Sequence, residues 1–445
     1  MNNVFRFPYQ DKDIVFIPFK QILLLADTSL WHRLNMALEG NLDPFEELGL
    51  TQKDMEYLKL SSPFTNKYNG IPQINTKPTS ATVFLTGKCT CRCLYCYANG
   101  GDNPSVMDWD LYSTIVGILI ANCLLTGTKH VKMHFHGGGD ISADWKLFRK
   151  AYDYLYQEAT NKGLKIFTSV GINGVLSEEQ AVWIARNVNN TTFSLDGSQT
   201  VHDMQRPLAN GKGSYVYAQR TLRIFDKLGY NYGLRMTVTD QSVDMLPGSI
   251  EDICSQYKVH KIMAEPMFPM GRTSVLTAPS QMKYISNFIS AKEIAKKYNR
   301  QLTYSGANLS SLCHTFCGAA GNSYCFTQTG KITSCYEIID ETTPLGEMFV
   351  FGEVNIKGKK LVIDDDKIRY LANMNVTYYD DCEHCFCKWH CAGDCPAKRA
   401  HSFASTDSGL HYRCKINKAL FFYQILEALD LHSNIDIFWE TVKSF

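Results

Sequence analysis

Apolar and polar positions alternate in a regular way between residue 79 and about residue 282. Short apolar segments, typical of strands, are followed by longer amphipathic segments, typical of helices. Strands that alternate with helices along a chain predict parallel β/α units. The predicted strands are Thr82–Leu85, His130–His136, Lys165–Val170, Thr191–Leu195, Gly233–Thr239 and Lys261–Met267.

Amphipathic helices are predicted in the gaps between these strands. Six such repeats predict an α/β fold, a partial TIM-like (β/α)6 barrel over residues 79–282. Ligand groups in parallel barrels lie at the carboxyl ends of the strands, so the residues after each strand are the candidates for chemistry. The predicted helices are Tyr112–Leu125, Trp145–Thr160, Glu178–Asn187, Tyr215–Lys227 and Val243–Tyr257.

Residues 1–75 predict a small, separate α+β module. Val4–Phe7 and Ile14–Pro18 are apolar runs on either side of a polar turn, which predicts a hairpin. Helices are predicted at Leu30–Leu38 and Thr51–Leu60, and the proline-containing residues 61–78 predict a linker. The alternative is that this region is a packing extension of the next domain.

Composition narrows the class of protein. A chain of 445 residues predicts two or three domains, and 45% hydrophobic with 20% charged residues is typical of a globular protein with a sizeable core. The formal net charge of +1 gives no electrostatic reason to expect a nucleic-acid or membrane partner. Without an apolar run of about 18 residues or a signal-like N-terminus, a cytoplasmic protein is expected. Sixteen cysteines in a reducing compartment favour metal over disulfides.

The first cysteine motif directly follows the first predicted strand. Cys89, Cys93 and Cys96 have C-x3-C-x2-C spacing, and Tyr95 precedes the last of them. Three thiolates on one tight loop suit a four-iron cluster whose fourth iron is open to a small molecule. A zinc site is the alternative, because C-x2-C pairs are common in zinc ribbons. The loop resembles the cluster loop of radical S-adenosylmethionine (SAM) enzymes, where SAM occupies the open iron and an aromatic residue at the place of Tyr95 is usual.

Motifs after the later strands extend this resemblance. The glycine triplet before Asp140 stands where the family has a Gly-Gly-Glu-Pro-like motif that contacts the methionyl ammonium, and Asp140 replaces the family's longer Glu. A series running from Ser194 through Asp196 and His202 to Arg206 matches radical SAM peptide and sulfatase maturases. Arg235 suits bidentate recognition of the SAM carboxylate, or an ion pair within the barrel. The resemblance implies SAM contacts from Tyr95, Gly137, Gly138, Gly139, Asp140, Ser194 and Arg235.

A second cysteine array lies within residues 305–445, which we predict to be a separate domain. Cys317 is followed by Gly330 and Cys335 in a C-x12-G-x4-C pattern. The next part reads C-x2-C-x5-C-x3-C from Cys382, and Cys414 follows. This array resembles the SPASM extension, and two zinc ribbons would need different spacing for its last three cysteines.

The SPASM resemblance implies two auxiliary [4Fe–4S] clusters, which makes three clusters with that of the Cys89 loop. The first auxiliary set is Cys317, Cys325, Cys335 and Cys395, with Cys313 as the alternative to Cys325. The second set is Cys382, Cys385, Cys391 and Cys414.

The whole resemblance covers about residues 79–420 and implies reductive cleavage of SAM to a 5′-deoxyadenosyl radical that abstracts a substrate hydrogen atom. The first hypothesis is a maturase that forms a thioether or carbon–carbon crosslink in a ribosomally made precursor peptide, with an external electron donor of the flavodoxin or ferredoxin type. The N-terminal module resembles the winged-helix elements that bind peptide leaders, and a leader would add a strand at Val4–Phe7 or at its hairpin partner.

Two other functions stay open at this point. One is an anaerobic sulfatase maturase that makes formylglycine, and the other is a zinc-stabilised binding module without catalysis. The sequence identifies no catalytic residue, although Asp196, Glu265 and His136 are each possible general bases.

Overall fold

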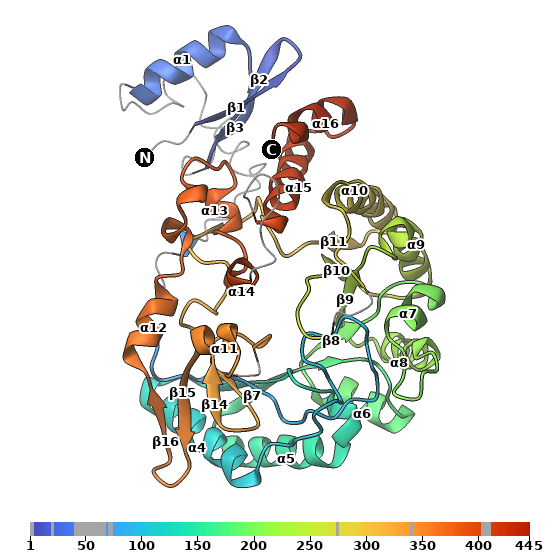
Figure 1. The fold of residues 1–445 in the computed structure, drawn as a ribbon, viewed down its shortest axis with the longest axis vertical. Coiled ribbons are helices and arrows are strands. Elements are labelled where there is room, and N and C mark those ends of the chain that lie inside the picture. Colours follow the sequence, from blue (N-terminus) through green and yellow to red (C-terminus); the bar gives the residue numbers. More distant parts are fainter. Residues whose placement is uncertain are drawn as a thin grey trace.

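The computed structural model describes residues 4–18, 22–39, 68–69, 74–272, 276–338, 341–401 and 411–445. Within this described part, an 11-stranded sheet of order β11-β10-β9-β8-β7-β6-β5-β13-β14-β15-β16 forms the centre of the molecule. The neighbouring pairs from β5 to β11 are all parallel. The fold is therefore mixed α/β with a large parallel sheet, and its helices form an arc outside the strands (Figure 1).

All six predicted strands are present, with ends that differ by no more than two residues. They are β5 (Ser80–Val83), β6 (His130–Phe135), β7 (Lys165–Ile172), β8 (Asn190–Ser194), β9 (Tyr232–Val238) and β10 (Lys261–Pro266). A seventh parallel strand, β11 (Gln301–Thr303), was not predicted because three residues give too little pattern. The parallel part is open, since β5 pairs on its other side with β13.

The predicted helices are also present. They are α4 (Trp109–Thr126), α5 (Trp145–Asn161), α6 (Glu178–Asn187), α8 (Tyr215–Leu228) and α9 (Leu246–Gln256), the last preceded by the short helix η3 (Val243–Met245). Three further helices lie between the strands: η2 (Ile141–Asp144), α7 (Gln199–Gln205) and α10 (Gln281–Lys297).

Alternation along the parallel strands separates the core from the site. On β9, Leu234 and Met236 are buried in the hydrophobic core, whereas the intervening Arg235 and Thr237 line a cavity. Because successive side chains of a strand point to opposite faces, the helix-covered face of the sheet is apolar and the other face can carry polar groups.

Helix α4 is the most apolar helix of the fold by composition. Asp108 caps its N-terminus by accepting a 2.8 Å hydrogen bond from the N–H of Asp110, and Gly127 ends it in the left-handed conformation at φ 72°. By length and hydropathy alone α4 could cross a membrane. Residues such as Leu111, Ile115 and Leu119 are instead buried in the hydrophobic core.

The N-terminal module has one strand more than predicted. The hairpin consists of β1 (Phe5–Tyr9) and β2 (Lys12–Ile17), and β3 (Ile22–Ala26) and α1 (Thr28–Glu39) follow. The central strand β2 is paired on both sides, so its prediction as an open edge was wrong. The helix predicted at Thr51–Leu60 lies outside the described residues, as does most of the predicted linker.

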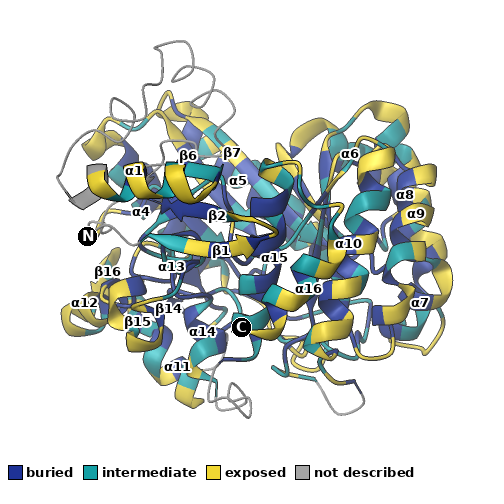
Figure 2. Cartoon of the chain, turned by 90° about the horizontal axis from the view of Figure 1, so that it is seen from above, coloured by how far each residue is buried: buried dark blue, intermediate teal, exposed yellow. Residues whose placement is uncertain are grey.

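One face of this small sheet packs on the C-terminal part of the chain rather than on the parallel sheet. The ring centroid of Phe7 lies 5.1 Å from that of Phe386 and 4.9 Å from that of Phe422. The ring of Phe16 lies 5.7 Å from that of Phe421. Figure 2 shows the hairpin seated beside α13 and α15.

The C-terminal region extends the main sheet and then turns into short helices. The strand β13 (Cys325–Phe326) is parallel to β5, and β14 (Lys331–Thr333), β15 (Val350–Asn355) and β16 (Lys360–Ile363) continue the sheet antiparallel. The strand β12 (Leu312–Cys313) pairs with β4 (Tyr68–Asn69) in a separate two-stranded sheet. Its helices are α11 (Pro344–Phe349), α12 (Asp365–Ala372), η4 (Val376–Tyr378), η5 (Asp380–Cys382), α13 (Lys388–Cys391), α14 (Pro396–Ala400), α15 (Tyr412–Ala428) and α16 (Ile435–Lys443).

Candidate functional site

A cavity of about 390 Å³ lies at the carboxyl ends of the parallel strands, where barrel ligands are expected. Strands β6 to β10 supply polar side chains to its wall. The first cysteine loop closes one side with Cys93, Tyr95 and Cys96, and the C-terminal region closes the other. The strand residues are His134, Ser169, Thr192, Ser194, Arg235, Thr237 and Glu265, and the C-terminal residues are Tyr336, Glu337 and Lys398.

Each thiol of the Cys89 loop has an N–H donor near its sulfur. The side-chain amide of Asn173 lies 3.6 Å from Cys89 Sγ, and the backbone N–H of Gly100 lies 3.3 Å from Cys96 Sγ. The guanidinium of Arg206 lies 3.7 Å from Cys93 Sγ. Hydrogen bonds to the sulfurs stabilise ligating thiolates and set the potential of an iron–sulfur cluster. Apart from their places in the motifs, nothing in the sequence marks Asn173 and Arg206 as partners of these sulfurs.

The three thiols of the motif differ in how readily they lose a proton. Burial raises the pKa of Cys89 to about 12 and also raises the pKa of Cys96. A hydrogen bond from Cys91 and the charge of Arg206 lower the pKa of Cys93 to about 7 in spite of its burial. A metal centre would deprotonate all three thiols outright, so the donor chemistry fits one.

Three thiolates on one loop suit a four-iron cluster, in which each thiolate binds a different iron. Zinc would need every thiolate about 2.3 Å from one centre. Among the described residues no group of three His, Cys, Asp or Glu side chains is found around a single point. The assignment of this loop to a four-iron cluster stays a prediction.

The glycine triplet packs against the cysteine loop. The N–H of Gly139 donates to Thr86 O at 2.8 Å, and a Cβ on Gly139 would lie 2.0 Å from Lys88 O, so only glycine fits there. The carboxylate of Asp140 is buried and accepts from the backbone N–H groups of Ser142 at 2.9 Å and Asn173 at 2.7 Å. Asp140 thus holds Asn173 beside Cys89, and a direct SAM contact from this loop stays a prediction.

Asp196 forms a buried anchor for the same loop. Its carboxylate lies 2.9 Å from Arg206 Nε, and it accepts the hydroxyl of Tyr95, the amide of Gln205 at 2.9 Å and the N–H of Thr237 at 3.0 Å. Although burial opposes ionisation, Arg206 and His202 lower the pKa of Asp196 overall. Both carboxylate oxygens of Asp196 already accept hydrogen bonds, and the residue does not line the cavity. The geometry therefore disfavours Asp196 as a general base.

Arg235 is one of three cationic residues in the described lining of the cavity, with Arg206 and Lys398. Burial opposes its charge, but Tyr336, Glu265 and Glu337 outweigh burial and raise the pKa of Arg235. Among the described residues no carboxylate lies within 4 Å of its guanidinium nitrogens, so the predicted alternative of a barrel ion pair is not seen. Ser194 and Tyr95 line the same cavity.

His136 is the neutral base of the cavity. Burial lowers the pKa of His136 to about 4, and its Nε2 lies 3.3 Å from the hydroxyl of Tyr97. Its ring lies edge-on to that of Tyr336, with centroids 5.1 Å apart. At neutral pH His136 is therefore uncharged, and the lowered pKa makes it a weak base.

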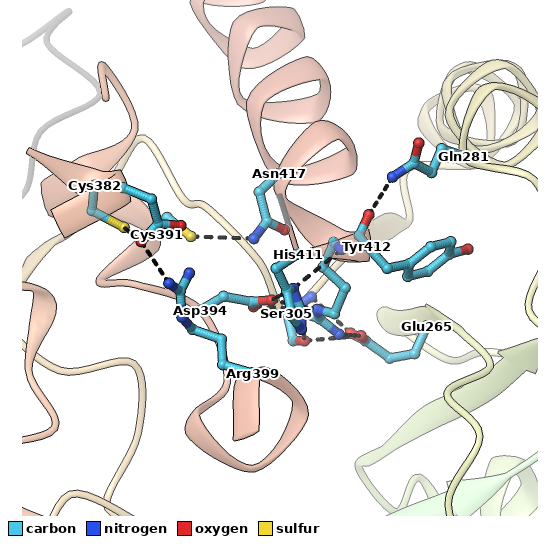
Figure 3. A network of polar contacts seen from close by, with 12 residues as sticks. Glu265, Gln281, Ser305, Cys382, Cys391, Asp394, Arg399, His411, Tyr412 and Asn417 are labelled. Carbon is cyan, nitrogen blue, oxygen red and sulfur yellow. Dashed lines mark hydrogen bonds and ion pairs between the residues drawn. The ribbon is translucent and has the colours of Figure 1, made fainter. Parts of the chain in front are cut away.

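Glu265 ties the cavity to the C-terminal region. Arg413 is buried and lies 3.1 Å from Glu265 and 2.9 Å from Asp394, and Glu265 also accepts the N–H of Ser305 at 2.7 Å (Figure 3). The sequence pattern missed Arg413 and Asp394, which are distinguished only by being next to Cys414 and Cys395. Since Arg413 and Ser305 already occupy its carboxylate oxygens, the geometry disfavours Glu265 as a general base.

The C-terminal cysteines fall into two groups. Burial raises the pKa of Cys335, and the nearby Cys395 and Cys317 raise this pKa further. Burial also raises the pKa of Cys325, with a further contribution from Cys317. These four are the first predicted auxiliary set. Cys313 lies elsewhere, on β12 and against a separate hollow of about 610 Å³. The placement favours Cys325 over Cys313 as the fourth ligand.

The second predicted set is also brought together. Burial and Asp394 raise the pKa of Cys391, and Cys385, Cys414 and Cys382 add to the effect. The amide of Asn417, on α15, donates to Cys391 Sγ at 3.2 Å, as an N–H donor does to a ligating sulfur (Figure 3).

Fold and site together point to a class of protein. A parallel sheet carries a three-cysteine loop after its first strand, and residues next to the second cysteine array, Tyr336, Glu337 and Lys398, line the other side of the cavity. No family model matches the chain. Cysteine-type anaerobic sulfatase-maturating enzyme of Clostridium perfringens is 20% identical over 371 residues, which is 78% of this chain and 96% of that protein. The serine-type enzyme of Bacteroides thetaiotaomicron is 21% identical over 360 residues, which is 74% of this chain and 84% of that protein.

Solved structures show the same fold. Native anSMEcpe with bound AdoMet superposes with a TM-score of 0.63 at 17% identity and covers 80% of this chain and 100% of its own. Streptococcus suis SuiB bound to precursor peptide SuiA superposes with a TM-score of 0.53 at 13% identity and covers 88% of this chain and 96% of its own. Over about three quarters of its length the chain is therefore similar in sequence to anaerobic sulfatase-maturating enzymes, and it shares their fold.

Proposed function

We propose that this protein is a radical SAM maturase that modifies a peptide. The observation that carries the proposal is the cavity between the two cysteine groups. Cys93 and Cys96 line it from one side, and Tyr336 and Glu337, which directly follow Cys335, line it from the other. A substrate in this cavity would touch both the SAM side and the auxiliary side of the protein.

Each residue of the site has a defined part in the proposal. Cys89, Cys93 and Cys96 would hold the SAM cluster, which supplies a 5′-deoxyadenosyl radical when SAM is bound and an external donor provides an electron. Arg235 would bind the SAM carboxylate through a charge-assisted hydrogen bond, with Ser194 and Tyr95 beside the cofactor. The C-terminal cysteines Cys317, Cys325, Cys335 and Cys395, and Cys382, Cys385, Cys391 and Cys414, would hold two auxiliary clusters.

The three candidate general bases are weak or already engaged. His136 is neutral and lines the cavity, whereas Asp196 and Glu265 are each held by an arginine. With its pKa lowered to about 4, His136 is a weak base at neutral pH, so we assign none of these three residues as the proton acceptor.

A precursor peptide is the substrate that we favour. The sheet order β1-β2-β3 leaves β1 and β3 as the outer strands among the described residues, and either could pair with an extended leader. SuiB, which was solved with a precursor peptide, covers 88% of this chain. The second candidate is sulfatase maturation, which the similarity to two sulfatase-maturating enzymes favours.

Anaerobic reconstitution tests the proposal. We expect about twelve irons per wild-type chain and about eight for Cys89→Ala/Cys93→Ala/Cys96→Ala, because each cluster holds four. The wild type should release 5′-deoxyadenosine from SAM with dithionite, and the triple variant should not. Cys123→Ala, which removes a buried core cysteine outside both groups, is the matched control. Stoichiometric zinc without SAM cleavage would refute the proposal.

A further inference from the structure

The central sheet ends at an open edge. Strand β16 is last in the sheet order, and β15 is its one partner among the described residues. Both views of the molecule place β16 at its outer margin (Figure 1, Figure 2). An edge strand presents unpaired N–H and C=O groups, to which another strand can pair unless side chains prevent it.

The ladder with β15 determines which backbone groups of β16 point outward. The N–H of Asp364 donates to Phe351 O at 2.8 Å, so the backbone of Asp364 points towards β15. Because the direction of hydrogen bonding alternates along a strand, the N–H and C=O groups of Leu361 and Ile363 point away from β15. A further strand would have to bond to these two residues.

The charges beside this edge are separated by sign. In the described part of the chain neither Lys360 nor Asp364 forms an ion pair, whereas Asp366 is bonded to Arg369 at 2.7 Å. Asp364 caps α12 through Oδ1 alone, by accepting from the N–H groups of Asp366 and Lys367, which leaves its Oδ2 for a further partner. The exposed charged residues are Lys357, Lys359 and Lys360 before the apolar residues 361–363, and Asp364, Asp365 and Asp366 after them.

This pattern fits a second copy of the same chain. When Val362 of two antiparallel copies lies on a two-fold axis, Leu361 pairs with Ile363 of the partner subunit, and their outward N–H and C=O groups bond to each other. In the same register Lys360 lies opposite Asp364 of the partner subunit, at both ends of the pairing. A two-fold interface needs one patch that complements itself, and the sequence of charges along β16 has this property.

Lysine on an edge strand is also a device that prevents pairing. On β16 that effect depends on direction. The lysines repel a strand that brings lysine to the same end, but an antiparallel copy brings the aspartates instead. Val362 lies at the centre of this pairing and is 43% exposed, so the second copy would cover an apolar side chain that one chain leaves in water.

We propose that β16 is a self-association surface, at which two copies of the chain pair antiparallel about Val362 and join their central sheets across a two-fold axis. A pairing of so few residues buries little area, so the dimer belongs to the weak, concentration-dependent class. Self-association at β16 is independent of the proposed function, because no residue of β16 lines the cavity of the candidate site.

Sedimentation velocity of the reconstituted full chain tests the pairing. Between about 5 and about 200 µM, which spans the Kd of a weak interface, we expect a monomer that converts to a dimer as the concentration rises. Lys360→Glu should weaken dimerisation about tenfold, because two opposite-charge pairs become like-charge pairs. Lys357→Glu makes the same change of charge in the turn before β16 and should dimerise as the wild type does.

A milder variant separates charge from helix capping. Asp364→Asn removes the carboxylate charge and keeps a side chain that caps helices well. It should weaken dimerisation about threefold, since two charged pairs are lost and no repulsion is added.

Hydrogen exchange of the wild type locates the surface without any substitution. The N–H groups of Leu361 and Ile363 should gain protection as the protein concentration rises, because they acquire partners in the dimer. The N–H of Asp364, which is already bonded to Phe351, should change little. The strand β11 (Gln301–Thr303), at the other end of the sheet, is the internal control and should not change.

Three results would overturn the inference. They are a monomer at every concentration, which would exclude a second copy as the partner of this edge, a dimer that Lys360→Glu leaves intact, and protection at β11 instead of β16. Should Lys360→Glu fail to fold by circular dichroism, Asp364→Asn and the exchange of the wild type decide the question.

Discussion

Removal of the Arg206 guanidinium tests how the protein anchors its first cysteine loop. Arg206 and Asp196 are 7% and 2% exposed, and their closest atoms are 2.9 Å apart. Breaking a buried pair from one side costs about 3–5 kcal/mol, because the remaining charge stays buried. Asp196 would keep the N–H of Thr237 and the amide of Gln205, so Arg206→Met should cost about 3 kcal/mol, the lower end of that range.

Thermal unfolding of the metal-free protein measures this cost. At about 2–4 °C per kcal/mol, Arg206→Met should lower Tm by about 6–12 °C. The double variant Arg206→Met/Asp196→Asn should recover part of the loss, because the stranded charge is removed. Lys283→Met is the control, since the Lys283–Asp244 pair is 2.8 Å long but its side chains are 59% and 63% exposed, and exposed pairs contribute about 1 kcal/mol or less.

The reasoning would be refuted if Arg206→Met lost no more stability than Lys283→Met, or if Asp196→Asn gave no recovery. The same variant also removes the N–H donor of Cys93. Reconstituted Arg206→Met should therefore show a shifted reduction potential of the Cys89-loop cluster, whereas Lys283→Met should not.

Three further predictions follow from local contacts. Arg235→Lys should weaken SAM binding to the reconstituted protein by about tenfold, since a bidentate charged contact is lost; an unchanged Kd in equilibrium dialysis would contradict this. Burial lowers the pKa of His202 to about 4, so the folded protein resists protonation of this ring while the unfolded chain does not. The free energy of unfolding should therefore fall as the pH drops from about 6.5 towards 4. The loss at pH 5 should be about 2 kcal/mol for this group, and His202→Gln should show a smaller drop in Tm between pH 7 and pH 5 than the wild type; an equal drop would count against it. Asp108→Ala should cost about 1 kcal/mol through the lost cap of α4, and Ser113→Ala on the same helix serves as its control in chemical denaturation.

The local elements were predictable because their signals are local. Alternation of apolar residues identified all six strands, and the helix from Glu178 to Asn187 was predicted to the residue. Its ends carry their own signals, with a Ser177–Gln180 capping box at the start. The third N-terminal strand and β11 escaped because short segments carry too little periodicity.

The candidate site was only partly predictable. Cysteines and glycines at fixed spacing are visible in a sequence, so the cysteine sets and the glycine triplet were found. The donors to the cysteine sulfurs were not, because an Asn, an Arg or a backbone N–H carries no signal that marks a sulfur as its target. The pairing of Glu265 with Arg413 was hidden for the same reason, since the two residues are 148 positions apart, and the pairing of Asp196 with Arg206, only 10 positions apart, still depended on how the chain folds back.

The sequence by itself determined the β/α repeat, the cysteine sets and the strand ends at which chemistry could lie, because periodicity and spacing act over a few residues. Only the tertiary structure decided which distant groups meet. Arg206 reaches Cys93 across 113 positions, and Arg413 reaches Glu265 across 148. It also decided that the N-terminal hairpin packs on the C-terminal helices and that a cavity separates the two cysteine groups. These contacts depend on the summed packing of the whole core, which no short stretch of sequence contains.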